Sequence, residues 1–474
     1  MIEISGIYFY VFVVYFLLMI GIGWQASKAV HSPSAYFLAD RNLKSWITAI
    51  SSTASSESAW AVLGTVGLAY KEGLSVIWFL PGCLLGYVIN WFLLADRLRK
   101  KSLETQALTL PDYLERHFRD STRSLRMLSV VIVFSCMMAY IAAQFTAIGK
   151  TFDAIFGIPH HISIPFGAAV IVAYTMLGGF LAVAWTDFVQ GIIMVFGMVF
   201  LTILVVIHLG GFAEMLSKVY IVSPQTLEWT GGKTLPVFIG SIIGLLGIGL
   251  GYPGQPHVLN RYMAAKDSQT ISRGTWIAFI WGFLVYASAI LLGVAGNALI
   301  PGLVDPEHLF PRSAEMVLPP LASAIVLTGI LAAIMSTVSA QIIVAGSSVS
   351  HDFYSKTLRK ELSHQETLKI TRLTILTLGI GSAVFALMET RVVFWFVLFA
   401  WSGLGASFGP LILFTLYSKK VTRQGALAGM MAGFFVTIVW KVTGLSDEIV
   451  YELVPAFLFS ALTIHFVSKV TSKR

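Results

Sequence analysis

Ser51-Ser52-Thr53-Ala54-Ser55-Ser56-Glu57-Ser58-Ala59-Trp60 places seven hydroxyl or carboxylate side chains in the middle of an apolar stretch of the chain. A carboxylate at the centre of a bilayer costs about 2.5 to 3.5 kcal/mol even on lenient insertion scales. We therefore expect this segment to face a polar cavity and not lipid. In an otherwise apolar chain, it is the first candidate for a site that binds an ion or a small solute.

The composition is typical of an all-α protein that crosses a membrane many times. Of the 474 residues, 56% are hydrophobic and 12% are charged, and the mean hydropathy is +0.79. A helix needs roughly 20 residues to cross about 30 Å of hydrocarbon. Division of the chain at charged or turn-rich breaks predicts about thirteen spans, near residues 4–26, 45–70, 74–95, 125–149, 162–179, 185–209, 235–256, 274–299, 316–347, 370–388, 392–417, 424–440 and 449–468.

The positive charges predict how these spans are oriented. Alternate loops carry 25 of the 32 lysines and arginines, eight of them between Arg97 and Arg126. Because basic residues gather in cytoplasmic loops, we expect a protein of the cell (inner) membrane with its N-terminus outside and its C-terminus in the cytoplasm. The same loop bias accounts for the net charge of +8, so no nucleic-acid partner is expected.

A second polar break, from Gly247 to His257, interrupts the seventh span much as the first break interrupts the second span. Glycine and proline weaken the helical hydrogen-bond ladder there and leave carbonyls that lipid could not satisfy. Broken helices at corresponding positions of two halves indicate a central site between inverted repeats. The alternative is that these residues only kink ordinary helices. The segment Gly249–Gly254 also matches a dinucleotide fingerprint, but no βαβ pattern surrounds it.

This pattern predicts one transmembrane transporter domain over residues 1–474, with a core of five plus five helices. The first repeat is expected at about 45–209 and the second at about 235–417. Peripheral helices are expected at about 4–26, 424–440 and 449–468.

The ninth span carries a third group of polar residues. The hydroxyls of Ser336 and Ser339 share one helical face with the small residues Ala333 and Ala340. Sodium is a hard cation that prefers oxygen ligands, and hydroxyls together with carbonyls of a broken helix would supply them. The alternative is a close-packed helix interface built from small residues.

These features resemble the sodium/solute symporter family and, within it, most resemble the sodium/proline symporters. The resemblance extends over nearly the whole chain. It is carried by Ala107-Leu108-Thr109-Leu110-Pro111-Asp112-Tyr113, Gly178-Gly179-Phe180-Leu181-Ala182-Val183 with Trp185-Thr186-Asp187, Gly254-Gln255-Pro256-His257, Ile330-Leu331-Ala332-Ala333-Ile334-Met335-Ser336-Thr337 and Gln424-Gly425-Ala426-Leu427-Ala428-Gly429-Met430.

The resemblance implies a sodium site between the second and ninth spans. Its ligands would be the backbone carbonyls of Ala54, Glu57 and Ala333 and the side chains of Ser336 and Thr337. The chain departs from the family pattern beside this site. Proline symporters usually carry Asp where this chain has Ser56, and Met where it has Glu57. The Glu57 side chain could restore the charge for the ion, meet a substrate ammonium or form hydrogen bonds inside the bundle.

The resemblance also points to Asp187. In some relatives the matching carboxylate joins hydroxyls of the ninth span in a second sodium site. Ser339 fits that pattern, whereas Ala340 stands where a further serine would be expected. The alternative is that Asp187 lies on the cytoplasmic exit path.

The substrate pocket implied by the resemblance can cover an apolar ring and offer hydroxyls to a carboxylate. An aromatic residue expected four positions before the pocket tyrosine of the seventh span is replaced by Ile248. The candidate pocket residues are Trp60, Tyr140, Tyr252, Pro256, Glu57 and Ser58.

The predicted function is therefore import of a small solute, coupled to sodium by alternating access. Proline or a related amino acid or carboxylate is the expected solute, with a betaine, an organic acid or a sugar as alternatives. A transporter-like sensor and a passive channel are further alternatives. We find no nucleophile or metal dyad, so an enzyme is not expected. The expected partners are the solute, sodium and the lipid bilayer, with no obligate protein partner.

Overall fold

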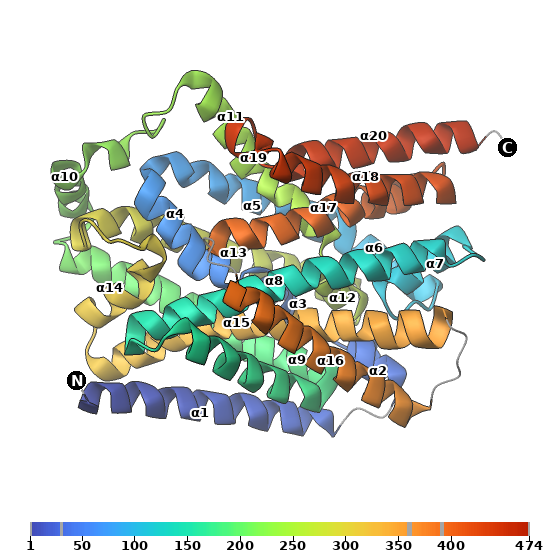
Figure 1. Ribbon diagram of the computed structural model, residues 1–474, viewed down its shortest axis with the longest axis horizontal. Helices are drawn as coiled ribbons and strands as arrows, with labels where there is room; N and C mark the ends of the chain where they lie inside the picture. Colours follow the sequence, from blue (N-terminus) through green and yellow to red (C-terminus); the bar gives the residue numbers. More distant parts are fainter. Residues whose placement is uncertain (1, 29–31, 358–362, 389–392, 473–474) are drawn as a thin grey trace.

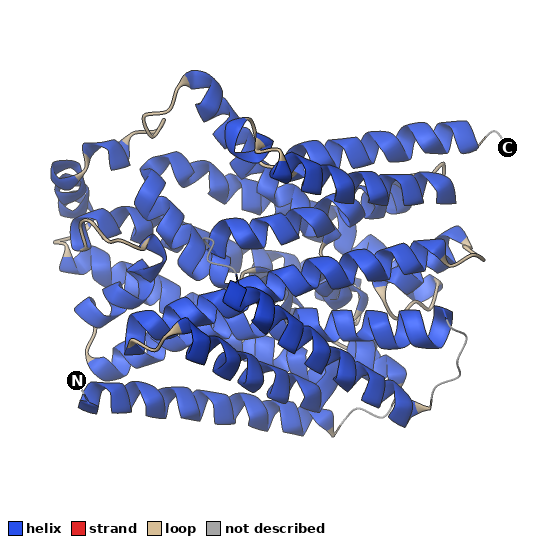
Figure 2. Ribbon diagram, viewed as in Figure 1, coloured by secondary structure: helices blue, strands red, loops and turns tan. Residues whose placement is uncertain are grey.

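The computed structural model describes residues 2–28, 32–357, 363–388 and 393–472. Within these ranges every regular element is a helix (Figure 2), and extended pairing is limited to one isolated bridge between Leu43 and Ala265. The predicted all-α fold is thus confirmed. The bridge joins the segment before α3 to the segment after α12, so it ties together the two spans that contain the predicted breaks.

The first half of the chain contains α1 (Ile2–Ser27), α2 (Pro33–Leu38), α3 (Ser45–Ser56), η2 (Trp60–Gly64), α4 (Thr65–Glu72), η3 (Gly73–Trp78), α5 (Phe79–Val88), η4 (Ile89–Leu94), α6 (Ala95–Glu104), α7 (Leu110–Phe118), α8 (Ser124–Phe156), α9 (His160–His208) and α10 (Phe212–Val222). The second half contains α11 (Leu235–Gly247), η6 (Ile248–Gly254), α12 (Pro256–Met263), α13 (Ser268–Leu299), η7 (Pro306–His308), α14 (Leu309–Val317), α15 (Pro320–Ser347), η8 (Ser348–Thr357), α16 (His364–Met388), α17 (Val393–Tyr417), α18 (Arg423–Val442), α19 (Leu445–Glu448) and α20 (Leu453–Thr471).

Eleven helical stretches of the described chain are long and apolar enough to cross a membrane, compared with about thirteen predicted spans. The two predicted spans that fall short are 45–70 and 162–179. The first is divided after Ser56, and its second part continues into the helical run that starts at Trp60. The second is a shorter apolar helix, His160–Ala173, and the non-helical backbone of Gly179 (φ 62°, ψ −166°) separates it from the rest of α9.

The first break has a local cause in its hydroxyls. Side chains of α3 bend back to carbonyls of their own helix, which competes with the regular ladder. These bonds run from Ser52 to Ala49, from Thr53 to Ala49 and Ile50, from Ser55 to Ser52 and from Ser56 to Thr53. The helix ends at Glu57, whose backbone leaves the helical region (φ −97°, ψ 80°), and the indole Nε1 of Trp60 donates to the freed carbonyl of Ser56 at 2.9 Å.

The carbonyls of the second break accept hydrogen bonds from side chains of η4, of α17 and of the break itself. Trp401 Nε1 donates to the carbonyl of Ile248 at 3.2 Å, and Asn90 Nδ2 donates to that of Tyr252 at 3.1 Å. Gln255 Nε2 lies 3.1 Å from the carbonyls of both Gly251 and Trp401. Each of these carbonyls is therefore satisfied without water, as a low-dielectric interior requires.

The two breaks lie in the interior of the bundle. Helix α3 packs against α9, α12, α13 and α15, and η6 packs between α5 and α17. Figure 1 shows α1 along one edge of the bundle and α18 and α20 along the opposite edge. It also shows α6, α7 and the end of α20 at one end of the molecule, and α10, α14 and the start of α1 at the other.

Candidate functional site

The oxygen groups predicted to bind sodium converge where α15 crosses the end of α3. Ser336 Oγ lies 3.0 Å from the carbonyl oxygen of Ala54 and 3.1 Å from that of Ala333. The hydroxyl of the next residue, Thr337, is buried and has no hydrogen-bond partner in the described part of the chain. Buried hydroxyls are normally paired, so Thr337 marks a place where an oxygen-seeking group fits.

The side chain of Glu57 forms hydrogen bonds with α5 and η6, whereas the oxygen cluster lies between α3 and α15. Its Oε1 accepts hydrogen bonds from Tyr87 (2.9 Å) on α5, Tyr252 (2.7 Å) on η6 and Ser56 (3.3 Å). The hydroxyl of Tyr286 on α13 lies 2.5 Å from that of Tyr252. Glu57 is fully buried, and its Oε2 has no hydrogen-bond partner among the described residues.

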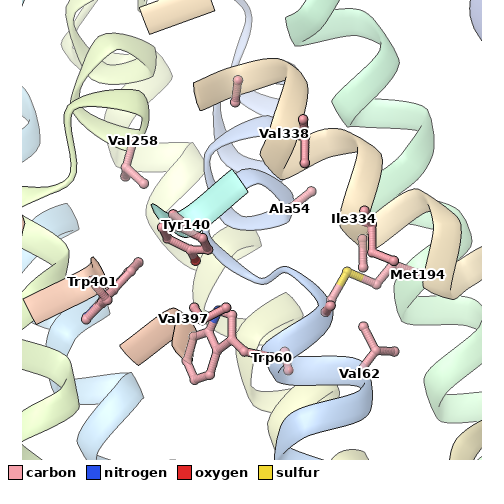
Figure 3. Close-up of a cluster of buried hydrophobic side chains, with 14 of the residues drawn as sticks. Ala54, Trp60, Val62, Tyr140, Met194, Val258, Ile334, Val338, Val397 and Trp401 are labelled. Carbon is pink, nitrogen blue, oxygen red and sulfur yellow. The ribbon is translucent and has the colours of Figure 1, made fainter. Parts of the chain in front are cut away.

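Aromatic rings gather beside the first break. The ring of Trp401 lies 6.0 Å from that of Trp60 and 4.8 Å from that of Tyr252. Figure 3 shows the side chains of Trp60, Tyr140 and Trp401 on the same side of the α3 break. The Tyr140 hydroxyl is buried without a hydrogen-bond partner in the described chain, and Pro256 is buried as the first residue of α12. Three of the predicted pocket residues, Trp60, Tyr140 and Tyr252, thus share one aromatic region.

Ser58 plays a structural part in this region. Its hydroxyl accepts a hydrogen bond from Gln144 Nε2 at 2.9 Å, and Gln144 Oε1 accepts one from the backbone N–H of Ala59 at 3.1 Å. Gln144, which lies on α8, therefore stabilises the chain at the first break through two hydrogen bonds. Sequence reasoning missed Gln144, although an amide inside an apolar span was a signal that could have found it.

Asp187 forms a buried ion pair that the sequence did not predict. Its Oδ2 accepts from Arg261 Nη2 at 2.7 Å and from Ser51 at 2.9 Å, while Ser339 Oγ lies 3.5 Å from its Oδ1. Arg261 also donates to Ser51 Oγ at 3.1 Å. The guanidinium thus neutralises the carboxylate that was a candidate for a second sodium ion. The signal was available, because Arg261 lies four residues after His257 in the second broken span.

A cavity of about 810 Å³ lies next to the aromatic region and is lined by residues that include Gly64, Ile248 and Phe394. The ring of Phe394 lies 6.2 Å from that of Trp60. Trp60 itself is completely buried, and Phe394, which packs next to it, lines the cavity.

An ion-pair cluster holds Phe394 in place. Glu307 accepts hydrogen bonds from the backbone N–H groups of Val393 and Phe394 at the start of α17, at 3.3 and 3.2 Å. Lys150 pairs with Glu307 at 2.5 Å and with Asp305 at 2.9 Å. Burial alone would raise the pKa of Asp305, but its hydrogen bond and charge interaction with Lys150 outweigh burial and hold that pKa below its usual range.

Comparison with known sequences gives consistent matches. Residues 36–433 match the model of the sodium:solute symporter family. The high-affinity proline transporter PutP of Bacillus subtilis is 36% identical over 458 residues, which are 96% of each chain. The sodium/proline symporter of Salmonella typhimurium is 37% identical over 96% of this chain and 91% of its own, and that of Staphylococcus aureus is 38% identical over 97% and 92%.

Solved structures share the fold. A Na+-coupled sialic acid symporter in a substrate-bound, outward-open state superimposes with a TM-score of 0.79 at 19% identity, over 98% of each chain. Mhp1, a nucleobase-cation-symport-1 family transporter, superimposes with a TM-score of 0.56 at 13% identity, over 93% of this chain and 96% of its own. At these identities the likeness is one of fold.

Proposed function

Because this chain belongs to the sodium:solute symporter family, we propose that it takes up a small solute, with proline as the first candidate, by coupling its movement to sodium. The relatives named for proline transport support this choice of solute, since they match almost the whole chain at 36 to 38% identity. The buried rings of Trp60, Tyr252 and Trp401 beside the first break offer an aromatic surface that suits an apolar ring.

The observation that carries the proposal is the oxygen cluster between α3 and α15. The carbonyls of Ala54 and Ala333 and the hydroxyl of Ser336 lie together, and the buried Thr337 hydroxyl beside them has no partner within the described chain. In this proposal these groups, with the carbonyl of Glu57, bind sodium. The ion then links a broken span to α15, so its binding and release are coupled to the movement of α3 against α15.

We further propose one sodium ion per solute. Arg261 already supplies the positive charge beside Asp187, and a second ion there would have to displace a guanidinium that is hydrogen-bonded on two sides. One ion moving through 100 mV contributes about 2.3 kcal/mol. A tenfold gradient adds about 1.4 kcal/mol. Together they would allow solute to be concentrated several hundredfold, on the order of 500.

The arrangement of repeats belongs to the same proposal. Residues of about 45–209 and 235–417 would form the two halves that move around the central site. The end of the molecule with α6, α7 and the end of α20 would face the cytoplasm, because the basic segment from Arg97 to Arg126 lies there.

The test is uptake of labelled proline into proteoliposomes with an inward sodium gradient, compared with potassium on both sides. We expect sodium-dependent accumulation by the wild type. Thr337→Ala and Ser336→Ala should raise the sodium concentration for half-maximal uptake at least about tenfold, because each removes an oxygen ligand. Matched controls are Thr328→Ala and Ser347→Ala, whose hydroxyls bond, among the described residues, to carbonyls of α15 itself, those of Ile325 and Val344.

Two results would count against the proposal. Proline uptake that is equal in sodium and in potassium would remove sodium coupling. Sodium dependence that is unchanged in both Thr337→Ala and Ser336→Ala would remove the site between α3 and α15.

A further inference from the structure

Glu57 has one carboxyl oxygen that the protein supplies with hydrogen-bond donors and one that it does not. Its Oε1 receives three hydroxyl donors, from Tyr87, Tyr252 and Ser56, whereas its Oε2 receives none from the described residues. The residue is completely buried, and within the described chain its side-chain hydrogen-bonding partners are hydroxyl groups and include no lysine, arginine or histidine. An ionised carboxylate in such a place is costly unless a donor or a positive charge meets its free oxygen.

The surroundings of Glu57 favour an organic cation over a metal ion. The ring of Tyr252 lies 5.2 Å from that of Tyr87 and 4.8 Å from that of Trp401, and the ring of Tyr286 lies 6.1 Å from that of Trp60. Aromatic faces stabilise ammonium groups through their quadrupoles. A sodium ion would need several more oxygen ligands, and the Oε1 lone pairs are already engaged by hydroxyls.

A second unpartnered group lies in the same aromatic region and has the opposite capacity. The hydroxyl of Tyr140 is buried beside Trp60 and can donate a hydrogen bond, but no described residue accepts it. An acceptor without a donor and a donor without an acceptor are complementary to a solute that carries both an ammonium and a carboxylate.

We propose that Glu57 Oε2 accepts a hydrogen bond from the protonated amine of the transported solute and that the Tyr140 hydroxyl donates to its carboxylate. This inference rests on the proposed function and narrows its substrate class to amino acids with at least one N–H on the ammonium nitrogen. Organic acids that lack an amine are excluded, because their charge would meet that of Glu57 in a low-dielectric site. Quaternary betaines are disfavoured because they have no N–H to donate.

Ligand-induced thermal stabilisation of the purified protein in sodium tests this proposal without relying on transport. Each probe is a five-membered ring that carries a carboxylate. The probes are proline, cyclopentanecarboxylate, in which a CH₂ replaces the ring amine, and N,N-dimethylproline, whose quaternary nitrogen has no N–H. The wild type should be stabilised by proline at concentrations at least about tenfold below those needed for either analogue. In Glu57→Gln this preference should fall by on the order of tenfold to a hundredfold, because a charge-assisted hydrogen bond becomes a neutral one.

Two further variants control for structural effects. Glu57→Asp keeps the charge and should keep the order of preference with weaker binding of every probe. Glu452→Gln neutralises another buried carboxylate, at the start of α20, and should leave the preference unchanged. Tyr140→Phe should weaken binding of proline and cyclopentanecarboxylate by similar factors, since both carry the carboxylate.

The inference is wrong if Glu57→Gln keeps the wild-type preference for proline, or if cyclopentanecarboxylate stabilises the wild type as well as proline does. It is also wrong if Glu57→Gln changes only the dependence on sodium, which would make the side chain an ion ligand. Sodium alone tests the proposed function separately. Stabilisation by sodium with no added effect of any amine would overturn only the inference, whereas no effect of sodium would overturn the coupling itself.

Discussion

Gly251 shows at the scale of one residue why the second break needs glycine. A Cβ atom at this position would lie 1.8 Å from the indole Nε1 of Trp401, which donates to the carbonyl of Ile248. Gly251→Ala must therefore displace Trp401 and should cost about 1 to 3 kcal/mol or more, as overpacked interiors do. We expect a lower Tm and loss of solute uptake. Gly21→Ala, which has no atom within 4 Å of the added Cβ, should change neither; equal behaviour of the two variants would contradict this role.

Single residues also show which parts of the candidate site could be predicted from the sequence. The grouping of Ala54 on α3 with Ala333 and Ser336 on α15 was implied by the resemblance to the sodium/solute symporter family, whose motifs match both segments. The direction of the Glu57 side chain could not be predicted, since it depends on hydrogen bonds from Tyr87 and Tyr252, which come from distant spans. A sequence gives the position of a charge along its helix, but the partner of that charge is set by packing.

The pair of Arg261 and Asp187 acts at the scale of elements, because it joins α12 to α9 while Ser51 of α3 bonds to both residues. Arg261→Gln leaves a buried carboxylate without its counter-charge. The free energy of unfolding, measured by denaturant titration in detergent, should fall by about 3 to 5 kcal/mol. Asp187→Asn combined with Arg261→Gln should recover most of that loss, since neither charge remains. If the double variant is as unstable as Arg261→Gln alone, the two residues are not energetically coupled.

Elements were predicted well where the apolar pattern is long and less well where the chain turns inside the membrane. The predicted spans at 45–70 and 162–179 are helical, yet each is shorter than a full crossing. The causes are the hydroxyl-rich end of α3 and the positive φ of Gly179. Hydropathy averages over such points, because one glycine or four serines hardly change the mean of a window of about 19 residues.

At the scale of the whole molecule, sodium should act as a stabilising ligand. A ligand that binds only the folded protein at one hundred times its Kd adds about 2.7 kcal/mol of stability. Replacing potassium by sodium should therefore raise the Tm of the purified wild type, and proline should raise it further, because coupling between two ligands is reciprocal. Thr337→Ala should lose the sodium effect and Thr328→Ala should keep it. A Tm that is the same in both salts would be incompatible with a sodium site in the folded protein.

The family and the fold expected from the sequence are both confirmed, the first by the match over residues 36–433 and the second by the solved symporters of the same architecture. The contacts that position Phe394 could not be predicted from the sequence. Lys150, Glu307 and Phe394 are far apart along the chain, and only the packed bundle brings them together. Their joint effect, the placement of Phe394 between the cavity lining and Trp60, is a property of the tertiary structure.

The side-chain donors of Asn90, Gln255 and Trp401 also affect how such a protein can diverge. They bond to carbonyls of the second break, so the loss of one of them removes a hydrogen bond from that backbone whatever solute is carried. The Tyr140 hydroxyl supports no backbone group in this way, because it has no hydrogen-bond partner within the described chain. A substitution at a position like Tyr140 can therefore alter which solute is bound, whereas a substitution at Asn90, Gln255 or Trp401 costs backbone hydrogen bonds with any solute.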